Sequence, residues 1–348
     1  MHVSYKKENV NPGLSKWVSI NHIHQQKHTT GLQTMRKFYV TTTCFGDRGG
    51  TVVKVLCYKS EGRWFDPEWS VRRLAGCRVK SITPETNTAL EEPISLEELR
   101  HAIIQEKANK ASGQDGICLE FFGTAWDVIK HEMLTIMNHM YIDGRTSVRQ
   151  RQGLIFCLPK TPHPKNVGDY RPLTLLNTDY KIMARIIANR IRPFLAAILH
   201  PNQHCGVQGN SVFEAVAAVR ETVAHAEVTK TPLCIVSIDF SEAFDKILHT
   251  YLLAMLKTHG FNEWFQQRIM RIYDKAASEV QINGFRSSPI PINSSIRQGC
   301  PLSMKLFAPC LNPLLQTLER ELNGIQIEWS HAKTAVISDA DDVTIFLT

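Results

Sequence analysis

The sequence lacks the long apolar runs and paired cysteines that identify several protein classes. No apolar run approaches about 18 residues, the length expected of a transmembrane helix. The start, Met1–Lys7, is not followed by an apolar core of signal-peptide length. None of the nine cysteines forms a Cys-x-x-Cys pair, so a zinc finger or knuckle is not expected. Their odd number, and the position of several of them inside apolar runs, predict free thiols in a reducing, intracellular compartment. Without a transmembrane run, no membrane partner is expected.

Most of the chain also lacks an excess of positive charge, although the net charge is +7. Residues 1–80 contain 14 Lys and Arg against 5 Asp and Glu, whereas residues 81–348 contain 26 against 28. A basic segment of this kind can bind phosphates without sequence specificity, and a solvated surface or a disordered arm explains the same composition. Residues 1–88 predict one strand around Val52–Leu56 and otherwise indicate no fold or function.

From residue 93 the periodicity predicts alternating helices and strands. Ser95 and Glu98 have the spacing of a capping box at the start of a helix, and an Asn-Gly pair at 283–284 predicts a hairpin turn. The helices are expected over 95–104, 119–142, 179–199, 240–259 and 302–322, the strands over 154–158 and 233–238, and hairpins over 281–285 and 335–347. Helices mixed with antiparallel hairpins favour the α+β class.

Two adjacent carboxylates, Asp341 and Asp342, stand between the apolar runs 335–337 and 343–347. This pattern predicts a strand, a tight turn and a second strand, with both aspartates at or near the turn. A carboxylate pair on a rigid hairpin suits Mg²⁺, which prefers oxygen ligands. The alternative is a solvated pair of turn residues.

A third carboxylate, Asp239, ends the apolar run 233–238. If that strand lies beside the 335–347 hairpin, Asp239 faces Asp341 and Asp342. Three carboxylates can hold two divalent ions about 3.5–4 Å apart, the arrangement used for in-line phosphoryl transfer. Taken alone, Asp239 could equally be a helix N-cap.

Further motifs surround these aspartates in a fixed order. They are Lys110–Gly116, Leu158–Lys160, Asp169–Asn177, Lys181–Ile182, Ala188–Ile191, His200–Gln203 with Gly206, Ala243–Asp245, Arg297–Ser303 and Ala340–Asp342. In this order they resemble the reverse transcriptases of non-LTR (LINE-type) retrotransposons, over about residues 93–348. Ala-Phe-Asp at 243–245 and the motif at 297–303 favour that branch over retroviral or group II intron enzymes.

The resemblance implies a right-hand polymerase fold with an antiparallel palm sheet. The reverse transcriptase domain is expected over 89–348, with fingers over about 89–230 and an incomplete palm over about 231–348, after a basic segment of unknown fold at 1–88. The family's chains continue into a thumb, which is expected to be missing here, so the chain is expected to be a fragment. The family's endonuclease domain is not recognisable in residues 1–90.

The resemblance also implies roles for the carboxylates. Asp239 and Asp341 would be the principal metal ligands and Asp342 a supporting one, holding two Mg²⁺ ions or Mn²⁺. The implied reaction is nucleotidyl transfer from dNTPs to the 3′-hydroxyl of a DNA primer on an RNA template.

Five further residues would bind the incoming nucleotide. Lys160 and Arg171 would bind the triphosphate as cations. The alternative for Lys160 is an ordinary surface lysine, and the alternative for Arg171 is a structural ion pair. Phe244 would crowd a ribose 2′-hydroxyl. The alternative is that Phe244 only packs in the core as an aromatic residue. Gln298 and Gly299 would line the nucleotide and template pocket. The alternative is that these two residues only form a turn.

The chain departs from the family at Asp339, where an aromatic residue is usual, and at Met304, where proline is usual. Asp339 adds a negative charge beside the expected metal site and the primer phosphates, so we expect weaker primer placement and lower activity. A catalytically silent remnant that at most binds nucleic acid is therefore the alternative function.

Overall fold

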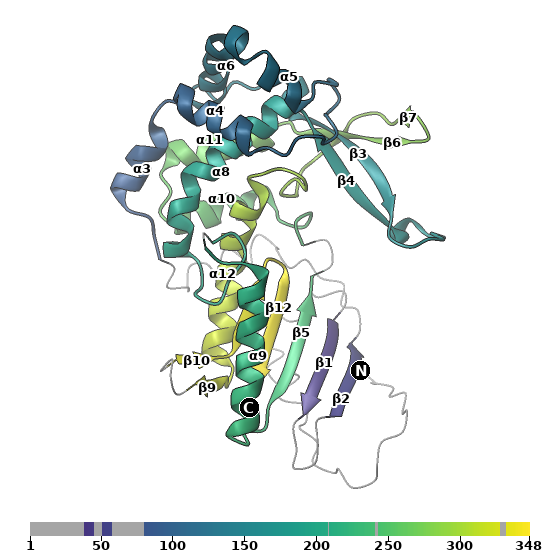
Figure 1. Cartoon of the computed structure of the whole chain (residues 1–348), viewed down its shortest axis with the longest axis vertical. Coiled ribbons are helices and arrows are strands. Elements are labelled where there is room, and N and C mark those ends of the chain that lie inside the picture. Colours follow the sequence, from purple (N-terminus) through teal and green to yellow (C-terminus); the bar gives the residue numbers. More distant parts are fainter. Residues whose placement is uncertain (1–37, 45–50, 58–79, 208, 241–242, 328–331) are drawn as a thin grey trace.

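The computed structural model describes residues 38–44, 51–57, 80–207, 209–240, 243–327 and 332–348. Helices and a five-stranded mixed sheet form one end of the molecule, and a three-stranded sheet between two helices forms the other (Figure 1). The expected mixture of helices with antiparallel hairpins is therefore present in the described part of the chain.

The helical end is built around one long buried helix, α8. It begins after Asn177, so the predicted cap Asp179 lies inside its first turn. The capping box of Ser95 and Glu98 is confirmed, because both reciprocal hydrogen bonds form. The helices at this end of the molecule are α3 (Pro84–Glu91), α4 (Leu96–Gln105), α5 (Leu119–Thr124), α6 (Trp126–Tyr141), α7 (Val148–Arg151), α8 (Thr178–Ile198), α10 (His249–Thr258) and α11 (Glu263–Tyr273).

Two predicted helices differ from what was expected: one is divided in two, and the other begins later. The segment 119–142 is divided into α5 and α6 because Ala125 has a ψ of 3° instead of a helical value. The break is compatible with burial of both Phe122 and Trp126. Residues 243–246 form turns, so the helix expected from 240 begins only at His249.

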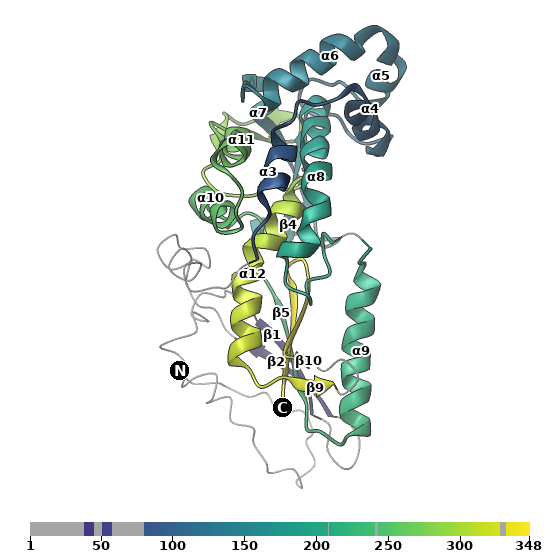
Figure 2. The same cartoon turned by 90° about the vertical axis from the view of Figure 1, so that its left-hand side faces the viewer.

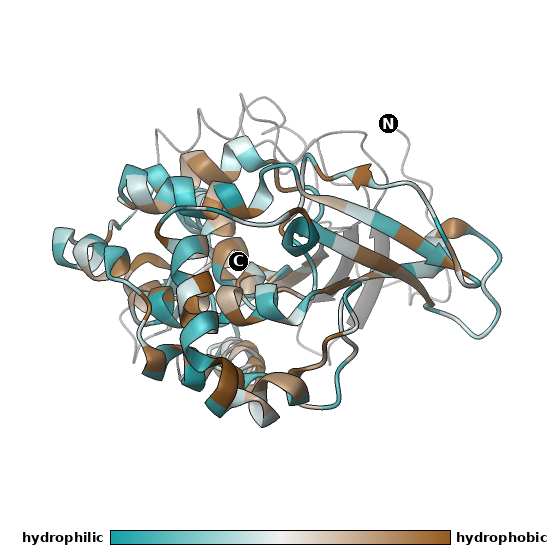
Figure 3. Ribbon diagram, turned by 90° about the horizontal axis from the view of Figure 1, so that it is seen from above, coloured by the Kyte–Doolittle hydropathy of each residue, from teal (hydrophilic) through white to brown (hydrophobic). Residues whose placement is uncertain are grey.

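The five-stranded sheet joins segments from distant parts of the sequence. Its strands are β3 (Gln152–Pro159), β4 (Tyr170–Leu176), β6 (Ala277–Ile282), β7 (Phe285–Arg286) and β8 (Ile290–Pro291). The order is β4-β3-β6-β7, with β8 also on β6, and the β3–β6 pair is parallel. Asn283 and Gly284 have φ values of 49° and 84°, as the predicted hairpin turn requires. The ribbons β3–β4 and β6–β7 project to one side of the helices (Figures 1 and 3).

The three-stranded sheet is antiparallel, in the order β11-β12-β5. Its strands are β5 (Cys234–Asp239), β11 (Val336–Asp339) and β12 (Asp342–Leu347). Helix α9 (Val212–Val228) lies on one side and α12 (Ser303–Glu321) on the other (Figure 2). Val343 and Ile345 join the main core, whereas Ile337 and Phe346 pack with α9 residues such as Ala215. This alternation follows from the period of two in a strand.

Two further strand pairs lie near this sheet. They are β1 (Phe38–Cys44) with β2 (Thr51–Cys57), and β9 (Ile325–Ile327) with β10 (Ala332–Thr334). Strand β2 contains the strand predicted at Val52–Leu56, and β1 lies beside β5 (Figure 1). Within the described residues, no helix has the length and apolarity needed to cross a membrane.

Candidate active site

The hairpin predicted around Asp341 and Asp342 is confirmed. Strands β11 and β12 pair from Val336–Ile345 to Asp339–Asp342, which leaves Ala340 and Asp341 as a two-residue turn. Ala340 has a φ of 54°, in the left-handed region. Asp341 is partly exposed and Asp342 is exposed, so both carboxylates lie at the surface on a rigid support.

Strand β5 lies beside this hairpin, which is the condition under which the sequence placed Asp239 opposite Asp341 and Asp342. It pairs with β12 so that Asp239 is in register with Asp342, which is itself in register with Asp339. Three aspartate positions therefore form one row across β5, β12 and β11, and we call Asp239, Asp342 and Asp339 the aspartate row. Directly opposed residues have Cβ atoms about 4.5–5.5 Å apart. Among the described side chains, which do not include that of Asp239, no metal-binding group of three or more His, Cys, Asp or Glu is found.

Helix α12 fixes the start of the hairpin. The Glu319 carboxylate accepts hydrogen bonds from the backbone N–H groups of Ala335 and Val336, each at 3.2 Å. Burial raises the pKa of Glu319, while these two hydrogen bonds and Lys333 act in the opposite direction. The apolar residues of β11 and β12 then set which residues of the hairpin can reach the surface.

Cys205 lies near the turn and is affected by its charges. Burial raises the pKa of its thiol to about 11, with smaller contributions from Asp339 and Asp341. The nearby Lys305 ammonium acts in the opposite direction, and its Nζ donates to the Gly206 carbonyl at 2.6 Å. The thiol therefore stays protonated at neutral pH.

Phe244 occupies the boundary between the core and the surface. Its ring stacks on Phe307 of α12, with centroids 4.3 Å apart and planes 26° apart. The ring is only partly buried, so it packs as a core aromatic and keeps one exposed part. Its role beside a ribose stays a prediction.

The next residue, Asp245, connects two of the predicted motifs. Its carboxylate accepts a hydrogen bond from Gln298 Nε2 and another from Ser295 Oγ, each at 3.0 Å. The backbone N–H of Ile296 also donates to the Phe244 carbonyl at 2.9 Å. Gln298 is therefore held by the segment that follows Asp239.

Gly299 brings the same loop against the five-stranded sheet. Its φ is 85°, and an added Cβ would lie 3.1 Å from the Thr174 carbonyl oxygen of β4. Both observations favour glycine at this position. The loop 297–302 thus touches both the segment after β5 and strand β4.

Lys160 and Arg171 lie on the projecting hairpin of β3 and β4. Lys160 follows β3, and its Nζ donates to the Gly168 carbonyl at 3.1 Å. Arg171 is exposed and pairs in register with Leu158. Both cations share one hairpin, but none of their observed contacts joins them to the aspartate row.

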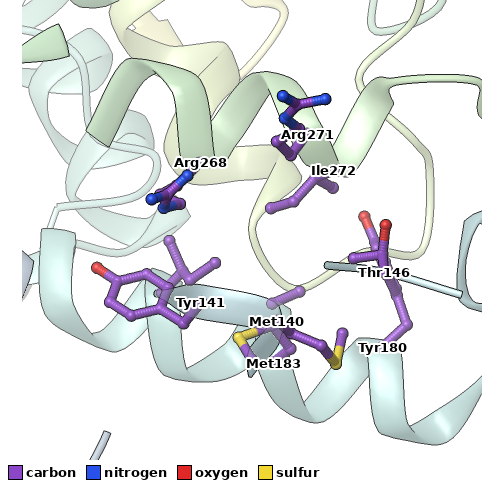
Figure 4. A pocket seen from close by; sticks show the side chains of 10 residues that line it. Met140, Tyr141, Thr146, Tyr180, Met183, Arg268, Arg271 and Ile272 are labelled. Carbon is purple, nitrogen blue, oxygen red and sulfur yellow. The ribbon is translucent and has the colours of Figure 1, made fainter. Parts of the chain in front are cut away.

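A small pocket lies apart from these residues, among α6, α8 and α11 (Figure 4). Figure 4 shows Arg268 and Tyr141 on opposite sides of it. Its lining includes no member of the aspartate row and none of the five residues predicted to bind the nucleotide. It is lined by Met140, Tyr141, Thr146, Tyr180, Met183, Ala184, Ile187, Arg268, Arg271 and Ile272.

The sequence placed Gln203 in a motif without giving it a role, and it did not single out Ser295 or the register of Asp339. Gln203 forms hydrogen bonds with the turn residue Ala340, and Ser295 with Asp245. The available signals were the position of Gln203 at the end of the 200–203 motif and serines just before the 297–303 motif. Neither signal identifies a partner more than 45 residues away.

The sequence of this chain is similar to those of several known proteins. Residues 159–348 match a family model described as reverse transcriptase (RNA-dependent DNA polymerase). The transposon TX1 uncharacterized 149 kDa protein of Xenopus laevis is 32% identical over 264 residues, covering 76% of this chain and 20% of that protein.

Two further relatives are similar over shorter or more divergent stretches. A Pol polyprotein from the type-1 retrotransposable element R2 of Nasonia vitripennis is 24% identical over 73% of this chain and 24% of its own length. The RNA-directed DNA polymerase from mobile element jockey of Drosophila melanogaster is 26% identical over 62% of this chain and 24% of its own length. The chain thus spans between a fifth and a quarter of these relatives.

Proposed function

Because the chain belongs to the reverse transcriptase family, we propose that it acts as the catalytic part of an RNA-directed DNA polymerase. The resemblance to enzymes of non-LTR retrotransposons is confirmed by relatives from TX1, R2 and jockey elements. The substrates would be dNTPs, a DNA primer and an RNA template. The observation that carries the proposal is the register of Asp239 with Asp342 beside the Ala340–Asp341 turn.

Asp239, Asp341 and Asp342 are proposed to hold two Mg²⁺ ions, or Mn²⁺. The donor chemistry fits, because Mg²⁺ takes carboxylate oxygens and keeps several waters, which an exposed site permits. Bound there, the ions would activate the primer 3′-hydroxyl and stabilise the charge of the leaving pyrophosphate. The protein's part is to fix the carboxylates on two paired strands.

We assign the fingers to about residues 89–230 and the palm to about 231–348. The antiparallel sheet β11-β12-β5 supports the palm assignment. The projecting hairpin β3–β4 supports the fingers assignment (Figure 1). Strand β6 pairs with β3, so one sheet contains chain from both sides of residue 230.

The nucleotide is proposed to lie between these two parts. Lys160 and Arg171 would bind its triphosphate, and two cations on one exposed hairpin support this role. Phe244 would limit the space beside the ribose. Gln298 and Gly299 would line the pocket, which the contact of their loop with β4 supports. Pairing with the template would select the base.

A reducing intracellular compartment is proposed for this activity. None of the six cysteines whose side chains the structure describes forms a disulfide, and Cys300 and Cys310 are buried. Cysteines that form no disulfides are typical of proteins from such compartments.

Primer extension tests the proposal. The chain is incubated with a poly(A) template, an oligo(dT) primer, dTTP and Mg²⁺, and Asp341→Ala is compared with the control Asp127→Ala, which removes an exposed carboxylate on α6. If the original chain and the control extend the primer but Asp341→Ala does not, the result supports the proposed polymerase activity. Extension that persists in Asp341→Ala contradicts the proposed site.

A second function, a catalytically silent remnant that binds nucleic acid, is favoured by one observation. Asp339 is in register with Asp342 and adds negative charge where primer phosphates would come. Salt-sensitive binding of the primer–template without extension would support this alternative.

A further inference from the structure

Gln203 contacts the turn between the two aspartate-bearing strands. Its side chain is completely buried. Its Nε2 donates to the Ala340 carbonyl at 3.4 Å, and its Oε1 accepts from the Ala340 N–H at 3.2 Å. One amide side chain therefore binds both the N–H and the C=O of the same turn residue.

Ala340 is a residue that needs such support. Positive φ at the first residue of a two-residue hairpin turn is ordinarily taken by glycine, because a Cβ is disfavoured there. Ala340 has a φ of 54° and is buried. A disfavoured backbone conformation persists only where the surroundings hold it. Gln203 supplies two side-chain hydrogen bonds to this residue, and the Cys205 thiol also contacts the Ala340 backbone.

The carbonyl of Ala340 belongs to the peptide group that precedes Asp341. Its orientation therefore sets the direction in which the Asp341 backbone, and hence its carboxylate, leaves the turn. The N–H of Ala340 belongs to the peptide group that follows Asp339. Gln203 thus grips the two peptide groups between Asp339 and Asp341.

The loop that carries Gln203 is itself tied to β11. Gln203 and Ser338 form a parallel bridge. The Ser338 N–H donates to the Asn202 carbonyl at 2.8 Å, and the His204 N–H donates to the Ser338 carbonyl at 2.9 Å. Gln203 Oε1 also accepts from the Cys205 N–H at 3.0 Å, which fixes the side-chain amide from within its own loop.

Helix α12 anchors this loop at its start. The Asn312 side chain is completely buried and accepts from the His200 N–H at 2.9 Å. Its Nδ2 donates to the Ile198 carbonyl at 2.7 Å. The loop is therefore connected to the core independently of the hairpin, and it can act as a support.

We propose that Gln203 is a positioning residue that holds the Ala340–Asp341 turn in the conformation needed to present Asp341. The inference rests on the proposed function, in which Asp341 is a metal ligand. Gln203 touches neither substrate nor metal in this account; it acts through the turn.

The test uses Gln203→Met, which keeps the length of the side chain and removes its hydrogen bonds. The matched control is Gln150→Met, because Gln150 is another buried glutamine with side-chain hydrogen bonds but lies in α7, among the helices of the other end. Amide hydrogen exchange of Ala340 is measured by NMR on both variants, together with the kcat and KM of primer extension and the Mg²⁺ concentration that gives half-maximal rate.

We expect Gln203→Met to speed exchange of the Ala340 amide about tenfold, the effect of losing a net hydrogen bond of ordinary strength. We also expect kcat to fall and the half-maximal Mg²⁺ concentration to rise, with the KM for dTTP unchanged. Gln150→Met should leave the exchange of this amide and the Mg²⁺ dependence unchanged, whatever its effect on stability.

Ala340→Gly provides a rescue, because glycine adopts positive φ without a Cβ. Added to Gln203→Met, it should recover part of the lost kcat. Unchanged exchange of Ala340 in Gln203→Met would overturn the inference, even if the chain extends primers normally. If no variant extends primers, accelerated exchange of the Ala340 amide in Gln203→Met still supports the positioning role of Gln203. In that case only the proposed function is contradicted.

Discussion

Replacing Asp245 tests whether Gln298 is positioned by the segment that follows Asp239. In Asp245→Ala, the Gln298 Nε2–H loses the carboxylate that accepts it at 3.0 Å. A hydrogen bond to a charged group contributes about 1.5–3 kcal/mol, which corresponds to about tenfold to hundredfold in kcat/KM at 1.36 kcal/mol per tenfold. We expect the loss mainly as a higher KM for dNTP, because Gln298 is proposed to line the nucleotide pocket.

Asp245→Asn should fall between the original chain and Asp245→Ala. An amide oxygen can still accept from Gln298, and a neutral hydrogen bond is about half as strong as a charge-assisted one. Ser295→Ala is the matched control, since it removes the other 3.0 Å hydrogen bond to Asp245 and leaves Gln298 in place. Its effect on KM should be smaller than that of Asp245→Ala.

The assay is steady-state incorporation of dTTP on poly(A) with an oligo(dT) primer, with the melting temperature of each variant measured in parallel. A double-mutant cycle with Gln298→Met then isolates the pair. If Asp245→Ala lowers the melting temperature but leaves the KM for dTTP unchanged, Asp245 is structural only. Fully additive effects of Asp245→Ala and Gln298→Met would show that Asp245 does not act through Gln298.

Three further outcomes are expected. Asp339→Tyr should raise primer extension several-fold, because like charges 4–5 Å apart cost about 1 kcal/mol in water and Asp339 is in register with Asp342; no gain would refute this. Burial lowers the pKa of His200 to about 4 from 6.5. The unfolded chain therefore takes up the proton first, so stability should fall as the pH drops from 6.5 towards 4; a constant urea midpoint across this range would contradict it. Iodoacetamide at pH 8 should modify exposed Cys118 and Cys157 before Cys310, whose thiol is buried and has a raised pKa, and mass spectrometry gives the order.

The parts of the site that the sequence predicted are those encoded by local patterns. Apolar alternation with a charged break indicated the hairpin of Asp341 and Asp342. A β-branched run ending in a carboxylate indicated the strand of Asp239. The order of the motifs then identified the family, which the comparison confirmed.

The parts that the sequence could not predict depend on long-range pairing. The register that aligns Asp339 with Asp342 and Asp239 is set by which apolar residues reach each side of the sheet. The bond of Gln203 to Ala340 spans 137 residues. The parallel pairing of β3 with β6 joins segments on either side of β5. No local periodicity specifies such partners.

Divalent cations are proposed to bind at the paired ends of β5 and β12. Fe²⁺ can replace Mg²⁺ at such a site and, with ascorbate and peroxide, cut the backbone near its position. We predict cuts around 239 and 339–342, which Mg²⁺ suppresses by competition and which are lost in Asp341→Ala. Cuts confined to other segments, or cuts near these residues that persist in Asp341→Ala, would contradict the account.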